Sequence, residues 1–380
     1  MILIKSLIFI TFILLVVDLI LKIAPKSNLE IIPKKYNFNK NEVTIDLKIF
    51  NNSKNKETMI PRFDLYIDFF ENGKLSEIIF KKSIIIEDGN IKRTLNNYWP
   101  TVIVKSKSSI NLSLNIKFDH NFNKNNFAWL KIIWENYGHF GLKTREDCFL
   151  INNNENRLKN RELIEIPINK EYKAIAIKTD VLGIFDNPEK TVINYCKDII
   201  KKNDILVIGE TPLAIMQGRY INPKNLDYTF LSKILCYFFH PTSSLATACG
   251  MQLLINKIGI TRIIIALFIG LFFKLIGIKG IFYRLTGSES SLIDDISGTT
   301  LPYDKTIVLG PINVNNFCTN ITKTIGIPTV IADVNDLGGV KIISNSKNIS
   351  KNILKEILKK NPAGNDDQKT PIVLFRKINS

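Results

Sequence analysis

Between residues 40 and 150, apolar and polar side chains alternate along the chain. The segments "VTIDLKI" (residues 43–49) and "FDLYIDF" (residues 63–69) each place every second residue on one apolar face. A period of two is typical of strands with one buried face. Asn72-Gly73, between two such runs, indicates a hairpin turn. The pattern predicts an antiparallel, immunoglobulin-like β-sandwich over residues 36–150, and its core is expected to contain Trp129 and Trp134.

From about residue 168 the pattern changes to alternating short apolar runs and helical periods. The runs "KAIAIKT", "DILVIG", "PTVIAD" and "GVKIIS" are typical of strands. The segment "DNPEKTVINYCKDIIKK" predicts a helix, with Asn187 as its N-cap and Pro188 in its first turn. A second, amphipathic helix is expected in "NISKNILKEILKKNPAGN". Residues 168–380 are therefore predicted to form a mixed α/β domain, so that the whole chain is of the α+β class.

The first 24 residues, "MILIKSLIFITFILLVVDLILKIA", form an apolar run. About 20 apolar residues are enough for a helix to cross a bilayer. No small-residue cleavage site ends the run, so we expect an uncleaved transmembrane anchor rather than a signal peptide. One lysine, Lys5, precedes the apolar run, and four follow it: Lys22, Lys26, Lys34 and Lys35. This excess of lysines after the run favours a cytoplasmic location for the other domains.

A second apolar segment, "RIIIALFIGLFFKLIGIK" (residues 262–279), interrupts the α/β pattern. As a helix its 16 inner residues would reach about 24 Å, which is short of the hydrocarbon core of a bilayer. A crossing would also separate the polar clusters on either side of it. We therefore expect either a buried core helix or a helix lying on a membrane surface, and the sequence leaves both open.

The formal charge of +16 suits anionic partners. The chain is rich in Ile, Asn and Lys, a general compositional bias that accounts for much of this charge without a specific partner. It contains no basic stripe interleaved with aromatic residues and no nucleic-acid-binding motif, so we expect no nucleic acid partner.

Three polar clusters interrupt the apolar pattern of the second half. The first, "GETPLAIMQGRY" (residues 209–220), follows a strand and ends with Gln217, Gly218 and Arg219. The second, "SLIDDISGTTLPYDK" (residues 291–305), and the third, "IADVNDLGG" (residues 331–339), are acidic. The candidate residues of these two clusters are Asp294, Asp295, Lys305, Asp333 and Asp336.

Carboxylates from two separate segments are suitable ligands for a hard cation such as Mg²⁺ or Mn²⁺. Asp333 ends an apolar strand, and α/β folds place ligands at that end of a strand. Arg219 and Lys305 would then meet phosphate or carboxylate charge. The alternative is structural, because Asp, Asn and Gly also gather in ordinary turns and both cations could be solvated surface residues. Neither common glycine-rich phosphate loop is present.

The motifs "DILVIGETPLAIMQGRYINP", "DDISGTTLPYDKTIVLGP", "ADVNDLGG" and "NPAGNDDQKTPIVL" resemble the coenzyme F-420 γ-glutamyl ligase family. The nearest resemblance is to its divergent, membrane-anchored branch, and it covers about residues 170–380. It implies a ligase that uses GTP, or ATP, and a divalent cation to activate a carboxylate as an acyl phosphate. The amine of a glutamate-like substrate would then form the amide bond. A homodimer is also implied.

By the same resemblance, Asp294 or Asp295 corresponds to the family's first metal-binding aspartate and Asp333 to its second. Gly218-Arg219 corresponds to the end of the first nucleotide-contacting loop. The ligases carry S-Q-K-I-V-S-K-A-E-G-R in that loop, where this chain has "GETPLAIMQGR". Two lysines and a glutamate are thus replaced by Thr211, Ile215 and Gln217. Two hypotheses follow: an active ligase, or a catalytically lapsed relative that binds an anionic ligand or scaffolds partners.

Overall fold

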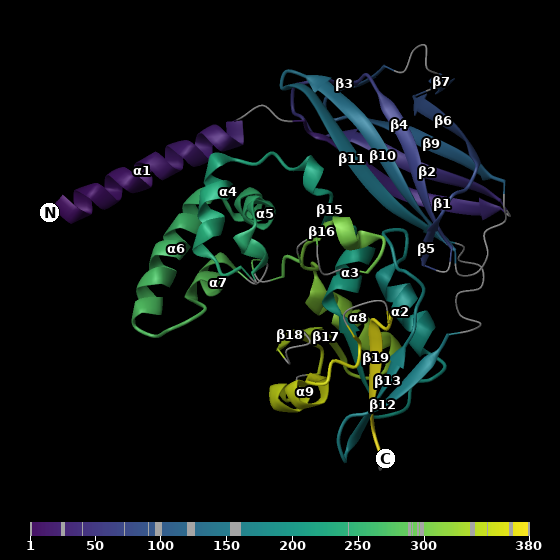
Figure 1. Cartoon of the computed structure of the whole chain (residues 1–380), viewed down its shortest axis with the longest axis vertical. Coiled ribbons are helices and arrows are strands. Elements are labelled where there is room, and N and C mark those ends of the chain that lie inside the picture. The colour runs from purple at the N-terminus through teal and green to yellow at the C-terminus, as the bar shows by residue number, and fades with distance from the viewer. Residues whose placement is uncertain are drawn as a thin grey trace.

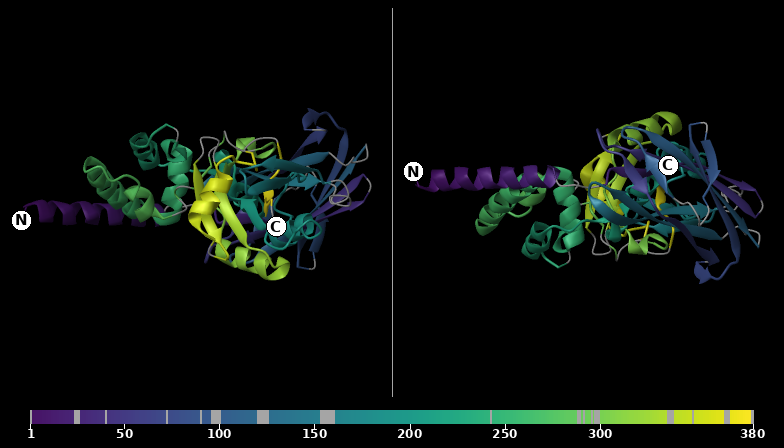
Figure 2. Two further views of the ribbon diagram at one scale, coloured as in Figure 1. Left: turned by 90° about the horizontal axis from the view of Figure 1, so that it is seen from below. Right: turned by 90° about the horizontal axis from the view of Figure 1, so that it is seen from above.

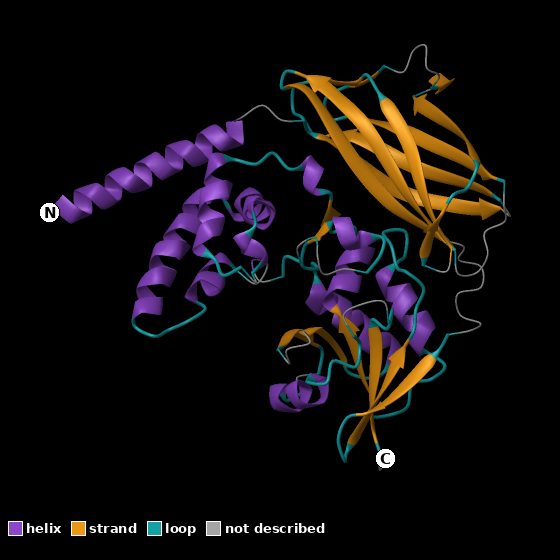
Figure 3. Cartoon of the chain, in the orientation of Figure 1, coloured by secondary structure: helices purple, strands orange, loops and turns teal. Residues whose placement is uncertain are grey.

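The structure, a computed structural model, is built from two β-rich domains, a layer of helices and an N-terminal helix (Figure 1, Figure 3). It describes residues 2–23, 27–39, 41–71, 73–89, 91–95, 101–119, 126–152, 161–241, 243–287, 290, 292–294, 296, 300–334, 339–347, 349–364 and 368–378.

The N-terminal β-domain is a sandwich of two antiparallel sheets. The first sheet has the order β1 (Leu29–Asn39), β2 (Glu42–Asn51), β9 (Ser109–Phe118), β6 (Phe80–Asp88), β7 (Ile91–Thr94). The second has the order β5 (Lys74–Ser76), β4 (Phe63–Glu71), β10 (Phe127–Gly138), β3 (Thr58–Ile60), β8 (Val102–Val104), and β11 (Gly141–Asn152) also pairs with β10. The predicted sandwich is therefore confirmed. The hairpin at Gly73 is present as the β4–β5 pair, and Asn72 lies outside the described residues.

The two tryptophans of β10 have different environments. Trp134 is fully buried in the sandwich core, as expected. Trp129 instead packs on the second domain, where its ring lies 4.9 Å from that of Tyr303 in an edge-to-face contact. The two residues are five positions apart, and an odd separation on a strand points two side chains to opposite faces. The prediction that both would lie in the sandwich core was wrong for Trp129.

Tyr303 connects this interface to the rest of the second domain. Its hydroxyl donates a hydrogen bond of 3.0 Å to the carbonyl of Leu182, and its side chain is buried. Replacing it with phenylalanine should lower the free energy of unfolding by about 1–2 kcal/mol, because the buried carbonyl loses this donor. Urea unfolding of Tyr303→Phe measures the loss. Tyr66→Phe, at an exposed tyrosine, is the control and should change nothing; an equal loss in both variants would contradict the assignment.

The second domain is centred on a six-stranded mixed sheet. Its order is β12 (Leu163–Pro167), β13 (Tyr172–Ile177), β19 (Ile372–Lys377), β14 (Ile205–Gly209), β17 (Thr329–Val334), β18 (Val340–Asn345). Only the β14–β17 pair is parallel among these. One face is covered by α2 (Pro188–Cys196), α3 (Glu210–Met216) and α8 (Val314–Ile325), and the other by α9 (Lys351–Leu358). The predicted strands and both predicted helices are confirmed.

Two boundaries differ from the expectation. The Asn187 side chain caps α2 by accepting a hydrogen bond from the Lys190 amide, but the helix ends at Cys196. It therefore stops before the lysines expected in its last turn. Residues 210–216, expected as a loop, form the helix α3, which turns directly out of β14.

A helical layer lies between the second domain and α1 (Ile2–Ile23) (Figure 1). It contains α4 (Phe230–Leu235), α5 (Ala248–Ile258), α6 (Ile260–Leu275) and α7 (Ile281–Thr286), with the short 3-10 turns η2 (Pro223–Asn225), η3 (Cys236–Phe238) and η4 (Ser244–Ala246). A further turn, η6 (Tyr303–Lys305), precedes β16 (Ile307–Val308), which pairs with β15 (Tyr220–Ile221). Over the described residues no single helix is long and apolar enough to cross a membrane. The α5–α6 pair reaches that criterion together, but it is bent by 113°.

Candidate functional site

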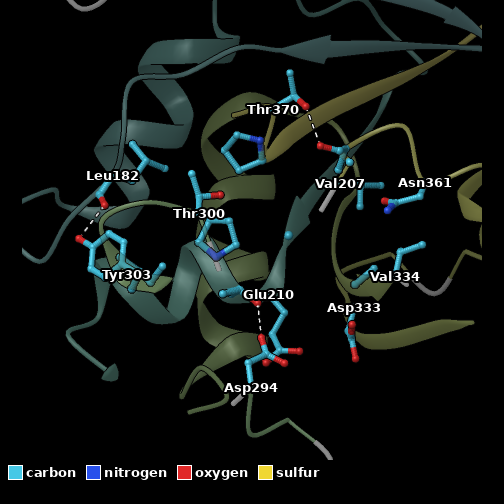
Figure 4. Close-up of a pocket in the computed structure, with 18 of the residues that line it drawn as sticks. Leu182, Val207, Glu210, Asp294, Thr300, Tyr303, Asp333, Val334, Asn361 and Thr370 are labelled. Atoms are coloured by element: carbon cyan, nitrogen blue, oxygen red, sulfur yellow. Dashed lines mark hydrogen bonds between the residues drawn. The ribbon is translucent and has the colours of Figure 1, made fainter. Parts of the chain in front are cut away.

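A pocket of about 1320 Å³ lies where the second domain meets the helical layer (Figure 4). Its volume exceeds the range of about 300–1,000 Å³ that is usual for small-molecule sites. One wall comes from the ends of β14 and β17. Another comes from the helical layer, with His240, Pro241, Ser243, Ser244, Thr247 and Tyr283. The C-terminal segments 358–364 and 369–373 close a third side.

Three carboxylates from separate segments meet in this pocket. Glu210 follows β14, Asp294 pairs with β16 through its backbone, and Asp333 lies near the end of β17. Figure 4 shows the side chains of Glu210 and Asp294 beside each other, with Asp333 facing the same part of the pocket. The Asp294 amide donates to the Val308 carbonyl at 2.8 Å, which fixes the position of its backbone.

These carboxylates perturb each other's protonation. The pKa of Glu210 is raised to about 9, first by burial and then by the negative charges of Asp294 and Asp333. Burial also raises the pKa of Asp294, with Asp333 adding to the effect, and the pKa of Asp333 is raised by burial. Such mutual repulsion between buried acids is typical of functional sites, although structural networks can produce it too.

Two neighbouring groups act in the opposite direction. The Thr211 hydroxyl donates a hydrogen bond of 2.7 Å to Asp294 Oδ2, which stabilises the ionised form of that carboxylate. Lys341 on β18 is the register partner of Asp333, and its positive charge lowers the pKa of all three acids. Burial lowers the pKa of Lys341 itself. One cation thus balances three carboxylates only in part.

The donor set suits a hard divalent cation, because it offers only oxygen ligands with repelling charges that a cation would neutralise. In the described part of the chain, however, no three His, Cys, Asp or Glu side chains are close enough to form a complete metal site. Asp295 and Asp336, two of the predicted ligands, lie outside the described residues. Of the four predicted metal ligands, the structure thus brings Asp294 and Asp333 to one pocket.

The predicted nucleotide-binding residues lie elsewhere. The described lining of the pocket does not include Gln217, Gly218, Arg219 or Lys305. The Gln217 side chain donates a hydrogen bond from Nε2 to the Ile312 carbonyl and accepts one at Oε1 from the Ile312 N–H, both at 2.9 Å. Arg219 Nε donates to the carbonyl of Gly310. Lys305 is exposed. These contacts are structural, and a role of the four residues in nucleotide binding stays a prediction.

Gly218 has a conformational reason to be glycine. Its φ is +69°, and an added Cβ would lie 2.2 Å from Cδ1 of Ile184. Gly218→Ala should therefore lower the free energy of unfolding by about 1–2 kcal/mol through left-handed backbone strain and the close contact. The control is Gly73→Ala, where φ is +81° and the added Cβ meets no atom within 4 Å. Urea unfolding should give a smaller loss for the control; equal losses would contradict a role for Ile184.

Two charged residues that line the pocket were not predicted as site residues. Glu210 was visible as an acid directly after a buried strand, the same signal that identified Asp333, but its proximity to Asp294 depends on the turn into α3. Lys369, which lines the pocket, comes from a turn before β19; it lies in the ligase-like motif "NPAGNDDQKTPIVL" but was not singled out as a site residue.

Comparison with known proteins relates the sandwich to a family. Residues 30–155 match the family model described as "F420-0:gamma-glutamyl ligase, N-terminal Ig-like domain". No curated protein sequence matches the chain.

Solved structures with some similarity include the GAE domain of GGA2p from Saccharomyces cerevisiae, at 12% identity over 34% of this chain and 96% of that one, with a TM-score of 0.22. Another is a FixG-related protein from Vibrio parahaemolyticus, at 12% identity over 33% and 95%, with a TM-score of 0.19. Scores this low indicate nothing about function. The family match relates the N-terminal domain to the ligases and supports a ligase-like relationship.

Proposed function

We propose that the pocket binds GTP or ATP together with Mg²⁺ or Mn²⁺ and supports formation of a γ-glutamyl-type amide bond through an acyl phosphate. The observation that carries this proposal is the convergence of Glu210, Asp294 and Asp333 at one side of a large pocket. Two further findings support it. The second domain carries the ligase-like motifs, and the sandwich matches the ligase family's N-terminal domain.

Asp294 and Asp333 would hold the cation, with Glu210 beside them. A bound cation would neutralise the carboxylates and stabilise charge on the transferring phosphoryl group. The protein's own groups set the conditions. Thr211 orients Asp294 through its hydroxyl, and Lys341 partly balances Asp333. Glu210 carries a proton at neutral pH, so a cation that approaches it competes with this proton. Cation affinity should therefore rise with pH.

The alternative function is a lapsed ligase that still binds a nucleotide or another anion, or that scaffolds partners. One observation favours it: Thr211 occupies a position where the ligases carry lysine, and its hydroxyl is used on Asp294. A nucleotide-turnover assay separates the two. Phosphate release that requires Mn²⁺, a carboxylate co-substrate and glutamate, and that Asp294→Asn removes, supports the ligase. Metal-dependent nucleotide binding without turnover supports the lapsed form.

For location, we propose that α1 anchors the chain in a membrane with the other domains on the cytoplasmic side. The support is the apolar run of α1 and the lysines that follow it. Protease protection in sealed vesicles tests this arrangement: digestion of the sandwich only from the cytoplasmic side is expected, and digestion only from the opposite side would contradict it.

A further inference from the structure

The outer side of α6 is apolar although it faces away from the helical layer. Ile260, Ile263 and Ala266 are buried, whereas Phe268, Phe272 and Leu275 are 64%, 62% and 86% exposed. Residues three and four apart lie on one helix face. Five exposed apolar residues of α6 share such a face, here called the outer face, and a sixth, Leu271, lies at its edge; the five are Ile265, Phe268, Ile269, Phe272 and Leu275. A helix on an aqueous surface normally has a polar outer side. One that is apolar all round needs a second apolar environment.

The exposed apolar surface extends beyond α6. In α4 and η3, Phe230 and Tyr237 are 77% and 87% exposed. The α1 helix, itself apolar, contacts the start of α6, where Asp18 Oδ1 accepts a hydrogen bond from the Ile260 amide at 3.4 Å. Both views in Figure 2 show α1 and the helical layer at the same end of the molecule. The outer face and the proposed anchor thus lie at the same end of the molecule.

The charges of this layer are predominantly positive; Asp227, between η2 and α4, is the acidic exception, and it forms an ion pair with Lys143 of the sandwich. Residues 228–287 contain six cationic residues and no acidic one; the cations are Lys233, Lys257, Arg262, Lys274, Lys279 and Arg284. Basic side chains around an apolar helix face are typical of helices that lie in the headgroup region of an anionic bilayer. The same charges oppose pairing with a second copy of this face, because two equally cationic surfaces would repel each other.

α6 does not cross the bilayer in this arrangement, because the chain segments before α5 and after α6 meet at the same pocket. Ser243, before α5, and Tyr283, on α7, have their hydroxyls 3.1 Å apart and both line the pocket. Gly270 of α6 lies against Phe282 of α7, where an added Cβ would meet Phe282 atoms at 3.1 Å. The α6–α7 unit is therefore a hairpin with both ends on the same side, so the outer face is the broad apolar surface that it presents.

We propose that the outer face of α6 lies in the headgroup and upper acyl region of an anionic lipid bilayer, as a second membrane contact beside α1. This contact does not depend on the proposed ligase function. It would place the wall of the pocket that contains Ser243, Thr247 and Tyr283 close to the membrane surface.

Site-specific fluorescence on the full chain tests this contact. The chain carrying Phe272→Cys or, separately, Leu275→Cys is labelled with an environment-sensitive fluorophore and reconstituted into phosphatidylcholine–phosphatidylglycerol vesicles that contain acyl-chain spin-labelled lipid. Both positions are exposed, so neither change disturbs the core. Lys355→Cys, at an exposed position of α9, is the matched control. Labelled protein without an introduced cysteine gives the background from the native thiols, four of which are buried.

The expected result is a blue shift and loss of most of the emission at positions 272 and 275, with no change at position 355. Labels at positions 272 and 275 that are not quenched would overturn the proposal, because the outer face of α6 would then lie outside the bilayer. Labels shielded from aqueous iodide but not quenched by lipid would also overturn it, in favour of a second copy of the chain. Equal quenching in vesicles of phosphatidylcholine alone would overturn the assignment of anionic headgroups.

Discussion

Glu210→Gln should make the protein more stable relative to wild type as the pH rises, by about 3–4 kcal/mol between pH 5 and pH 8. Glu210 has a folded-state pKa of about 9, while its ordinary value is 4.5. Between these values the folded state keeps a proton that the unfolded state has released. Wild-type stability therefore falls as the pH rises through this window. Glutamine preserves the shape of the neutral side chain and has no proton to lose.

Urea unfolding at pH 5 and pH 8, in the presence of a chelator, measures this difference. The control is Glu165→Gln, at an exposed acid whose pKa is lowered by its bond and charge interaction with Lys173. That residue titrates below the window, so its replacement should add no pH dependence between pH 5 and pH 8. If Glu210→Gln and wild type show the same pH dependence, the buried-acid assignment is contradicted.

Asp333→Asn should weaken Mn²⁺ binding by at least about 100-fold, since even residues outside the first ligand shell commonly cost 10–100-fold. The substitution keeps the shape of the side chain but removes the charge that the cation would meet. It also relieves the repulsion on Glu210 and Asp294, so the apo protein should not be destabilised. Asp294→Asn is expected to have the same effect on Mn²⁺ binding.

Electron paramagnetic resonance of free Mn²⁺ in titrations of the full chain measures this affinity. Asp304→Asn is the matched control, because Asp304 lies on η6 in the same stretch of sequence but is not among the described pocket-lining residues. Mn²⁺ affinity that is unchanged in Asp333→Asn and Asp294→Asn would exclude these carboxylates as the cation site.

The fold class was largely predictable because the two parts of the chain have different hydrophobic periods. The alternation in residues 43–49 is reproduced in β2, where Val43, Ile45, Leu47 and Ile49 are fully buried. The odd separation of Trp129 and Trp134 on one strand also predicts that their side chains point to opposite faces of the sheet. What Trp129 contacts could not be predicted, because Tyr303 lies 174 positions later in the chain.

The helical layer was harder to predict. Only α6 carries a strong apolar signal, and its period cannot distinguish a buried helix from one at a membrane surface. The structure buries one face of α6, with Ile260, Ile263 and Ala266, and leaves the outer face exposed. α4 and α5 begin at Thr229 and Thr247 caps, but their short apolar runs do not differ enough from strands to be assigned.

The candidate site was predictable where the backbone pattern fixed a position. Asp333 lies near the end of an apolar strand, and Asp294 lies in an acidic cluster, so both could be proposed as ligands. Arg219 shows the limit of this reasoning. Its residue type suits a phosphate, but its Nε is directed to the Gly310 carbonyl by the turn after α3, and no local pattern encodes that direction.

The most direct test of the central claim is calorimetric titration of the full chain with GTP, in the presence and absence of Mn²⁺. The account predicts binding that requires Mn²⁺ and that disappears in Asp333→Asn while Asp304→Asn retains it. GTP binding of equal strength without Mn²⁺, or no binding of GTP or ATP by folded protein under either condition, would contradict a metal–nucleotide site in this pocket.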